Sequence, residues 1–187
     1  MKEKIRALLG CGPTLTERIC KSRNQLYRIA LSWSADPMLA DDLVQDTLNM
    51  AIDKQDKLRD TDKLQAWLYR ILYRNWMQHL RRRKPHEDWD DGYSDGRDST
   101  AEHARQDEIC AAVRQAVAAL PESQRAVISL VDLQGMSYAE VAEVLDVPIG
   151  TVMSRLSRGR KALCQALQQF KDNDNRNTAP VRFRRIK

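Results

Sequence analysis

Two helical patterns follow one another between residues 137 and 163, across a turn too short for anything but a sharp crossing. Ser137-Tyr-Ala-Glu140 has the spacing of a capping box, which favours the start of a helix. Pro148 then pushes Val147 out of helical geometry and separates this helix from the next one. An inward stripe at spacings of four, three and four marks the second helix: Val152, Leu156, Gly159 and Leu163. The segment is therefore predicted to be a helix-turn-helix, which projects its second helix outward.

This helix-turn-helix leaves a polar and basic face outside when its apolar stripe is turned to the core. The residues of that face are Met153, Ser154, Arg155, Ser157, Arg158, Arg160 and Lys161. Arginine suits bidentate contacts with guanine or phosphate, and serine can hydrogen-bond to either. A basic solvated face on a helical hairpin is the simpler interpretation. The capping box, the short turn and the four exposed cations together favour binding in the major groove of DNA.

The rest of the chain is also predicted to be helical, so the fold class is all-α. Helix formers dominate, and the 187 residues include only seven glycines, six prolines and two phenylalanines. A capping box at 14–17 precedes helically spaced apolar residues up to Trp33, and Asp36-Pro37 opens a second helix. After a polar break at 54–62, a third helix is expected from about Lys63 to Arg83.

An acidic segment divides the chain. Residues 87–108 carry nine acidic and two basic residues, a net charge of −7 in a chain whose overall net charge is +5. Glycine and serine interrupt the segment and it shows no apolar period, so it is predicted to be a flexible linker. The expected organisation is an N-terminal helical domain at 1–86, the linker at 87–108, a C-terminal helix-turn-helix domain at 109–170 and a basic, disordered tail at 171–187.

The third N-terminal helix carries a second basic surface. From Trp67 to Trp76 it interleaves aromatic residues with Arg70 and Arg74, and it runs into a basic cluster at 81–84. Aromatic faces can stack on unpaired bases while cations neutralise phosphates, so the pattern suits single-stranded or melting DNA. Trp67 and Trp76 are themselves predicted to lie in the core, because they share a face with apolar residues of the same helix.

Several other classes of protein do not fit the sequence. No apolar stretch can cross a bilayer and the first residues lack the apolar core of a secretory signal, so a cytoplasmic protein without membrane insertion is expected. The four cysteines and three histidines form no zinc-like spacing, so free thiols, no metal and no cofactor are expected. The acidic run from Asp88 has Ser99 where a calcium loop needs Glu, and no nucleophile stands beside a base at catalytic spacing. We therefore predict no enzyme.

Five blocks of sequence carry a family resemblance. They are Ala40-Asp-Asp-Leu-Val-Gln-Asp-Thr47, then Ala66-Trp-Leu-Tyr-Arg-Ile71 leading to His79-Leu-Arg-Arg-Arg-Lys84, then Leu120-Pro-Glu-Ser-Gln-Arg-Ala-Val127, then Tyr138-Ala-Glu-Val-Ala142, and Gly150-Thr-Val-Met-Ser-Arg-Leu156. In this order and with these gaps, the set resembles the extracytoplasmic-function (ECF) class of sigma-70-family factors. The resemblance extends over about residues 26–167.

The resemblance implies an alternative sigma factor that binds core RNA polymerase, recognises the −35 and −10 elements of promoter DNA and promotes strand opening. Its acidic helix would bind the clamp helices of the polymerase β′ subunit through Asp42, Gln45 and Asp46. The polar break at 54–62 corresponds to the loop that captures a flipped base of the −10 element. Contacts to that element are assigned to Asp60, Lys63, Arg70, Arg74, Arg81 and Arg82. Because only the right base offsets the cost of flipping, recognition would be coupled to strand opening without ATP.

The C-terminal domain would read the −35 element through the exposed helix-turn-helix face and pack its outer surface on the flap of the β subunit. The acidic linker would thread toward the RNA exit path, where its charge fits a surface that normally holds nucleic acid. An anti-sigma factor is the expected inhibitory partner. Arg74 and Gln78 depart from the usual family pattern, so we expect an unusual −10 preference. Met153 stands where a basic residue is common, which removes one possible phosphate or base contact. Gly159 replaces a usual alanine and should loosen the recognition helix by up to about 1 kcal/mol.

The main alternative is a dimeric helix-turn-helix regulator that binds operator DNA. Such a protein needs a dimer interface and symmetric half-sites. The sequence has no heptad repeat, and its two basic surfaces differ in kind, which suits an asymmetric promoter better.

Overall fold

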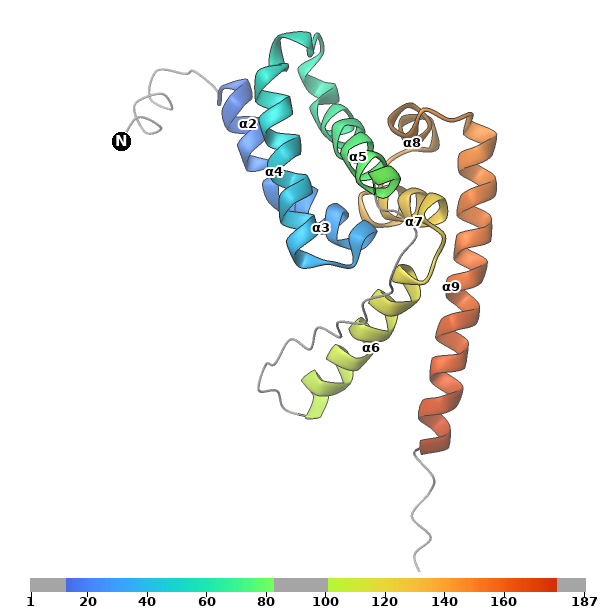
Figure 1. The fold of residues 1–187 in the computed structure, drawn as a ribbon. Helices are drawn as coiled ribbons and strands as arrows, with labels where there is room; N and C mark the ends of the chain where they lie inside the picture. The colour runs from blue at the N-terminus through green and yellow to red at the C-terminus, as the bar shows by residue number, and fades with distance from the viewer. Residues whose placement is uncertain (1–12, 83–100, 178–187) are drawn as a thin grey trace, which may run out of the picture.

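The computed structural model describes residues 13–82 and 101–177, with side chains described at 13–82 and 109–168. These ranges are helical and contain no strand, which confirms the all-α fold class. The N-terminal unit holds α2 (Leu15–Lys21), α3 (Arg23–Ser34), α4 (Pro37–Asp53), the 3₁₀ turns η1 (Gln55–Lys57) and η2 (Thr61–Lys63), and α5 (Leu64–Arg82). The C-terminal unit holds α6 (Ala101–Ala118), α7 (Glu122–Ile128), the π-helical turn η3 (Ser129–Leu133), α8 (Tyr138–Leu145) and α9 (Ile149–Asn177) (Figure 1).

Capping side chains fix the N-terminal helix starts where the sequence predicted them. The Oγ1 of Thr14 accepts from the backbone N of Glu17 at 3.3 Å, and Oε2 of Glu17 accepts from the backbone N of Thr14 at 2.8 Å. Oδ1 of Asp36 accepts from the backbone N of Met38 at 2.9 Å. Each bond satisfies an N–H group that has no partner within its helix, so α2 and α4 begin at these caps.

The first N-terminal helix is interrupted at Ser22, which apolar spacing alone did not reveal. Ser22 donates from its hydroxyl to the carbonyl of Arg18 at 3.0 Å and accepts from Nε2 of Gln65 at 3.0 Å. A serine hydroxyl that bonds back to the preceding turn competes with the helical ladder. The predicted helix is therefore two helices, α2 and α3, that meet at a buried serine.

An aromatic cluster forms the core between α3 and α5. The rings of Trp33 and Trp76 stack with centroids 5.2 Å apart, and Tyr73 meets Trp33 edge-on at 5.9 Å. Trp33 and Trp76 are each 1 % exposed, which confirms that Trp76 is a core residue. Trp67 is partly buried and packs against the same core. The cluster fixes one face of α5 inward and leaves its charged residues outside.

The helix-turn-helix forms as predicted. Asp146 has the left-handed φ of 56° between α8 and α9, and Gly135 has φ 69° after η3. Val152 and Leu156 of α9 are buried. Tyr138 is 37 % exposed at the start of α8. The crossing of α8 and α9 therefore depends on a tight backbone turn that a short polar residue tolerates.

Gly159 has a packing role that the sequence did not show. A Cβ at this position would lie 2.5 Å from Cδ1 and 3.3 Å from Cγ1 of Ile128. The glycine therefore lets α9 approach α7 closely. This contact offsets the helix propensity that glycine loses relative to alanine, about 1 kcal/mol.

Two helix boundaries differ from the predicted organisation. α6 begins at Ala101, inside the segment expected to be a linker, and α9 continues to Asn177, beyond the expected domain end at 170. Glutamate, glutamine, lysine and arginine are good helix formers, so a polar composition does not by itself exclude a helix. Residues 83–100 and 178–187, where the rest of the linker and of the tail was expected, lie outside the described residues.

The two units touch each other directly. α3 packs against α6, α7 and η3, while α5 packs against α8 (Figure 1). Arg125 of α7 donates to the carbonyl of Trp33 at 2.6 Å and to the carbonyls of Leu120, at 2.9 Å, and Ala118. Burial lowers the pKa of Arg125, and the nearby carboxylate of Glu122 acts in the opposite direction. The carbonyl bonds thus hold a guanidinium between the units.

Candidate nucleic-acid interface

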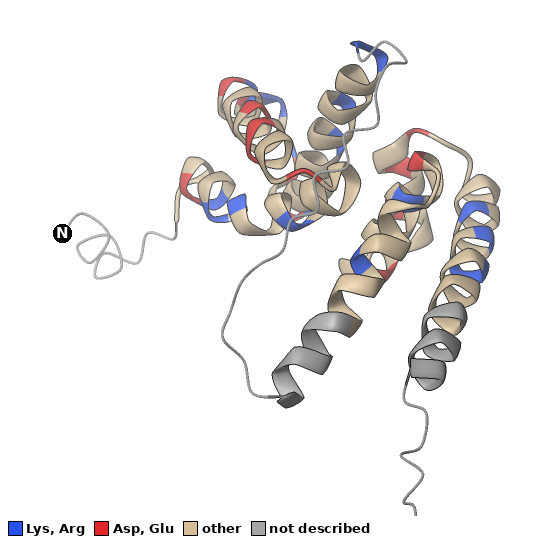
Figure 2. Cartoon of the chain, turned by 60° about the horizontal axis from the view of Figure 1, so that its bottom comes forward, with Lys and Arg blue, Asp and Glu red and all other residues tan. Residues whose placement is uncertain are grey.

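The first turns of α9 present a continuous exposed face. Most of the residues predicted for this face are exposed: Met153, Ser154, Ser157, Arg158, Arg160 and Lys161. Arg158 donates from Nε to the carbonyl of Ser154 at 3.2 Å, and so lies along the helix surface. Figure 2 shows the Lys and Arg positions spaced along this helix. The face has the length and charge that major-groove binding requires.

Two arginines of this face are more constrained than the sequence suggested. Arg155 is half-buried. Burial raises the pKa of Tyr73 in α5, and the positive charge of Arg155 acts in the opposite direction. Arg160 makes a bidentate ion pair with Asp132 of η3, from Nε at 3.1 Å and Nη2 at 2.5 Å. The hydrogen bonds that Arg160 donates to Asp132 raise the pKa of Arg160. Arg160 therefore already has a partner within the chain.

Gly150 leaves open space beside the first turn of α9, a feature that the sequence analysis did not predict. A Cβ built at this residue meets no atom within 4 Å, and Ile149 beside it is 49 % exposed. Met153, one helical turn after Ile149, is 53 % exposed. An absent side chain beside two exposed apolar ones lets another molecule approach the helix backbone closely.

The start of α8 is held by the predicted capping box. Oγ of Ser137 accepts from the backbone N of Glu140 at 3.3 Å, and Oε2 of Glu140 accepts from the backbone N of Ser137 at 2.8 Å. The Ser137 hydroxyl also donates to Oε2 of Glu140 at 2.7 Å. These bonds lower the pKa of Glu140, with a smaller contribution from the charge of Lys63. Because α8 supports α9, the box helps to aim the exposed face.

The second basic face runs along α5 and the turn before it. Its exposed cations are Lys63, Arg74, Arg81 and Arg82. Arg70 is half-buried and donates to the backbone carbonyl of Glu143 in α8, from Nε at 3.1 Å and from Nη2 at 2.6 Å. Asp60 is exposed, and its Oδ1 accepts from the backbone N of Asp62 at 2.9 Å. The structure therefore gives Asp60 a capping role at η2 and Arg70 a partner in the other unit.

Tyrosine side chains border this second face. The hydroxyl of Tyr69 donates to Oε1 of Gln134 at 2.7 Å. Burial raises the pKa of Tyr69 to about 12, with the charge of Arg28 acting in the opposite direction. Burial also raises the pKa of Tyr73, against the charges of Arg155 and Arg81. Both phenols are therefore neutral hydrogen-bonding groups at physiological pH.

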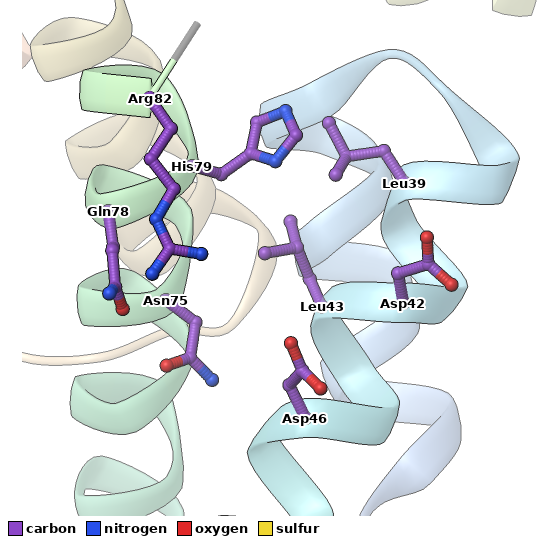
Figure 3. A pocket seen from close by; sticks show the side chains of 8 residues that line it. All are labelled: Leu39, Asp42, Leu43, Asp46, Asn75, Gln78, His79 and Arg82. Atoms are coloured by element: carbon purple, nitrogen blue, oxygen red, sulfur yellow. The ribbon is translucent and has the colours of Figure 1, made fainter.

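An acidic face on α4 adjoins the end of α5. Asp42, Gln45 and Asp46, which the resemblance assigns to polymerase binding, are exposed on consecutive turns. A cleft of about 210 Å³ separates this face from α5 (Figure 3). Its walls are Leu39, Asp42, Leu43 and Asp46 on one side and Asn75, Gln78, His79 and Arg82 on the other. Sequence spacing did not predict that His79 and Arg82 would face Asp42 and Asp46 across a cleft.

Within the described residues, no group of three or more His, Cys, Asp or Glu side chains is placed to hold a metal ion. The described cysteines are free thiols, with Cys20 and Cys164 exposed and Cys110 half-buried. No described helix is long and apolar enough to cross a membrane.

Two family models match the two units. The sigma-70 region 2 model matches residues 20–86, and the sigma-70 region 4 model matches residues 110–163. The first match contains α4, η1, η2 and α5, and the second contains the helix-turn-helix. Each of the two basic faces therefore falls in a different matched region.

Curated relatives are similar along most of the chain. The ECF RNA polymerase sigma factor SigM of Mycobacterium tuberculosis is 35 % identical over 149 residues, which is 79 % of this chain and 74 % of SigM. The RNA polymerase sigma-H factor of Pseudomonas aeruginosa is 31 % identical, over 80 % of this chain and 84 % of its own length. The ECF sigma-E factor of Escherichia coli is 32 % identical, over 68 % of this chain and 73 % of its own length.

Two solved structures share the fold. The sigma factor RpoE of Bartonella quintana, in complex with the anti-sigma factor NepR, aligns with a TM-score of 0.62 and 28 % identity, over 81 % of this chain and 94 % of RpoE. CnrH, in complex with the cytosolic domain of CnrY, aligns with a TM-score of 0.57 and 26 % identity, over 81 % of this chain and 85 % of CnrH.

Proposed function

The chain belongs to the ECF class of the sigma-70 family and is an alternative RNA polymerase sigma factor, and from this premise we propose which of its surfaces carry each step of initiation. The observation that supports the assignment most is that two basic faces of different construction lie on two helical units, one within each matched region. Sigma factors are initiation factors, and we propose that this chain likewise has no catalysis of its own.

The exposed face of α9 reads the −35 element in this proposal. It uses Met153, Ser154, Arg155, Ser157, Arg158, Arg160 and Lys161. A helix with small polar residues at its centre can enter the major groove, and arginines at its sides can reach guanine edges or phosphates. The ion pair between Arg160 and Asp132 favours a phosphate contact for Arg160, because a base contact requires the side chain to swing away from its partner.

In this proposal the face of α5 binds the −10 element as the two DNA strands of that element separate. The cations Lys63, Arg70, Arg74, Arg81 and Arg82 neutralise phosphates, and Asp60 shapes the turn at which a flipped base is captured. A flipped base costs a few kcal/mol of stacking, and only a fitted pocket offsets that cost. Sequence recognition and strand opening are therefore one event in this proposal.

The acidic face of α4 binds the polymerase. Asp42, Gln45 and Asp46 point outward on one side of α4, where they can pair with basic residues of the clamp helices of β′. The cleft beside Asp42 and Asp46 gives a partner side chain access to both carboxylates and to Arg82. The outer surface of the C-terminal unit binds the β flap.

The remaining partners follow from the family. RpoE of Bartonella quintana was solved with an anti-sigma factor, and we propose that an anti-sigma factor also controls this chain. We further propose that the chain works in the cytoplasm and is organised as a polymerase- and −10-binding domain at 1–86, a linker at 87–108, a −35-binding domain at 109–170 and a basic tail at 171–187.

Run-off transcription tests the proposal. Bacterial core polymerase is mixed with a library of promoter-like fragments, with and without the full chain, and the selected templates are sequenced. Transcripts that start downstream of a shared two-part motif are the expected result. If the chain instead binds palindromic DNA tightly by itself and adds no initiation to core polymerase, the dimeric regulator is the correct assignment.

A further inference from the structure

The polar segment at 54–62, which we assign to the capture of a flipped base, is bonded to α2 by two side chains. Thr16 donates from its hydroxyl to Oε1 of Gln55 in η1 at 3.0 Å. Arg18 donates from Nη2 to the backbone carbonyl of Thr61 in η2 at 2.8 Å. The partners of these bonds are 39 and 43 residues apart along the chain. One short helix is therefore attached to both 3₁₀ turns of the segment.

The backbone bonds within the segment are short-range. The backbone N of Leu58 donates to the carbonyl of Gln55 at 3.1 Å, and the backbone N of Lys63 donates to the carbonyl of Asp60 at 3.2 Å. Neither η1 nor η2 contains a buried residue. Hydrogen bonds in 3₁₀ turns have poorer geometry than those in α-helices, and exposed turns gain little from packing. We therefore expect the conformation of the segment to depend on contacts from outside it.

The two turns present a short extended stretch between them. Leu58 has φ −80° and ψ 98°, and Asp60 has φ −120° and ψ 108°. Arg59 and Asp60 are exposed, whereas Leu58 is partly buried against the core. A movement of either turn would change the position and direction of the two exposed side chains. The bonds from α2 hold the turns on both sides of this stretch.

α2 is itself anchored in the N-terminal unit. Its start is fixed by the capping box of Thr14 and Glu17, and Ile19 is fully buried. The hydroxyl of Ser22, at the end of the helix, accepts from Nε2 of Gln65 in the first turn of α5 at 3.0 Å. α2 also packs against α4 (Figure 1). The helix is therefore a fixed support from which Thr16 and Arg18 reach the segment.

We propose that α2 positions the base-capture segment at 54–62, with Arg18 and Thr16 as its positioning residues. Only a fitted pocket offsets the cost of flipping a base, so a segment held in one conformation captures that base more tightly than a mobile one. Arg18 contributes more than Thr16, because a charged donor makes the stronger hydrogen bond. Both residues act through the segment and contact no base. The inference rests on the proposed function of the segment.

An abasic nucleotide separates this positioning role from a contact with DNA. Holoenzyme is assembled from core polymerase and the full chain. Fluorescence anisotropy then measures its dissociation constant for two non-template-strand oligonucleotides of a selected −10 element. One oligonucleotide is intact, and the other is abasic at the position where loss of the base weakens binding of the parent holoenzyme most. The ratio of the two dissociation constants, abasic over intact, measures how strongly the base is captured.

Arg18→Ala should lower this ratio about three- to tenfold, in line with the loss of one hydrogen bond. The whole change should come from weaker binding of the intact oligonucleotide, because the abasic one leaves no base to capture. Arg18→Lys keeps a cationic donor and should restore part of the ratio. Lys21→Ala removes an exposed cation of the same helix, and should leave both dissociation constants unchanged.

Thr16→Val repeats the test without a large loss of side-chain volume. It removes the donor to Gln55 and should lower the ratio about twofold, since a hydrogen bond between neutral groups is weaker than one from a guanidinium. Threonine and valine are similar in shape, so a lower ratio in this variant does not come from a cavity beside α2.

Two results would overturn the inference. Equal weakening on both oligonucleotides by Arg18→Ala means that Arg18 contacts a phosphate or supports the domain in general. An unchanged ratio in that variant means that the segment keeps its conformation without α2. A parent holoenzyme that binds intact and abasic oligonucleotides equally at every −10 position counts against the proposed function of the segment, and the inference falls with it.

Discussion

The two helical units present their basic residues in opposite ways. In the C-terminal unit the assigned residues follow one another on a single helix, and most are exposed. In the N-terminal unit the assigned residues are spread along α5 and the turn before it, over an aromatic core, and Arg70 is bonded to the other unit. The proposed −35 face is therefore formed by one exposed helix surface. The proposed −10 face instead lies over buried aromatic packing, and one of its arginines is bonded to the other unit.

We expect the largest loss of stability from a substitution in the aromatic core of the N-terminal unit. Trp76→Ala removes a ring that is 1 % exposed and stacks on Trp33, so it should lower the free energy of unfolding by about 3–5 kcal/mol. Urea unfolding followed by circular dichroism measures the change. Trp67→Ala on the same helix is the matched control and should cost less, because Trp67 is only partly buried. Equal costs for the two variants would show that α5 does not depend on the aromatic cluster.

The next largest effect should distinguish use of the −35 element from use of the −10 element. Arg155→Ala should weaken the use of the −35 element by about 1–3 kcal/mol and leave the −10 element mostly intact, whereas Arg74→Ala should do the reverse. Run-off transcription on templates with one element altered at a time measures both. Arg114→Ala removes an exposed cation that is assigned to neither element and should change neither. If Arg155→Ala impaired both elements equally, the faces would not act separately.

A smaller effect concerns the helix that supports the C-terminal face. Ser137→Ala removes the cap of α8 and should cost about 1 kcal/mol of stability at neutral pH. The bonds from Ser137 lower the pKa of Glu140, so this carboxylate contributes stability above its ordinary pKa and loses that contribution as pH falls through the lowered value.

Unfolding in urea at neutral and at acid pH separates the two parts of this effect. The difference between parent and Ser137→Ala should shrink as the pH falls from the ordinary pKa of glutamate through the lowered pKa of Glu140. Thr14→Ala, which removes the equivalent cap of α2, is the matched variant in the other unit. A difference between parent and variant that stays constant with pH would mean that the Glu140 carboxylate takes no part in the cap.

Local signals made the C-terminal unit more predictable than the N-terminal one. The capping box at Ser137, the turn at Asp146 and the stripe through Val152 act within a few residues, so sequence spacing reveals them. The hydroxyl of Ser22 also accepts a hydrogen bond from Gln65, and the position of Arg70 depends on Glu143. Those contacts join residues 43 and 73 positions apart, and no local pattern encodes them.

The same limit applies to the assigned sites. Most of the residues that sequence and resemblance identified are exposed, but Arg70 and Arg155 are half-buried. Sequence and resemblance did not reveal the ion pair of Arg160 with Asp132 or the cleft that lies between Asp42 and Arg82. Both features depend on how separate helices pack. The variants described above test which of these residues contact DNA or polymerase.

The smallest effect that we predict concerns a single thymine methyl group in the −35 element. Met153 is 53 % exposed beside the open position at Gly150, and an apolar side chain in the major groove favours the methyl group of thymine. Replacing one thymine of the −35 element by deoxyuridine removes only that methyl, and should weaken holoenzyme binding about fourfold at one position. Met153→Ala should abolish this difference, and Met153→Leu should keep most of it. Deoxyuridine in the −10 element is the matched control, because its effect should not depend on Met153. Equal holoenzyme binding to thymine and deoxyuridine at every −35 position would show that Met153 does not recognise the methyl group. A difference that persists in Met153→Ala would show the same. The face of α9 would then select sequence through its arginines and serines alone.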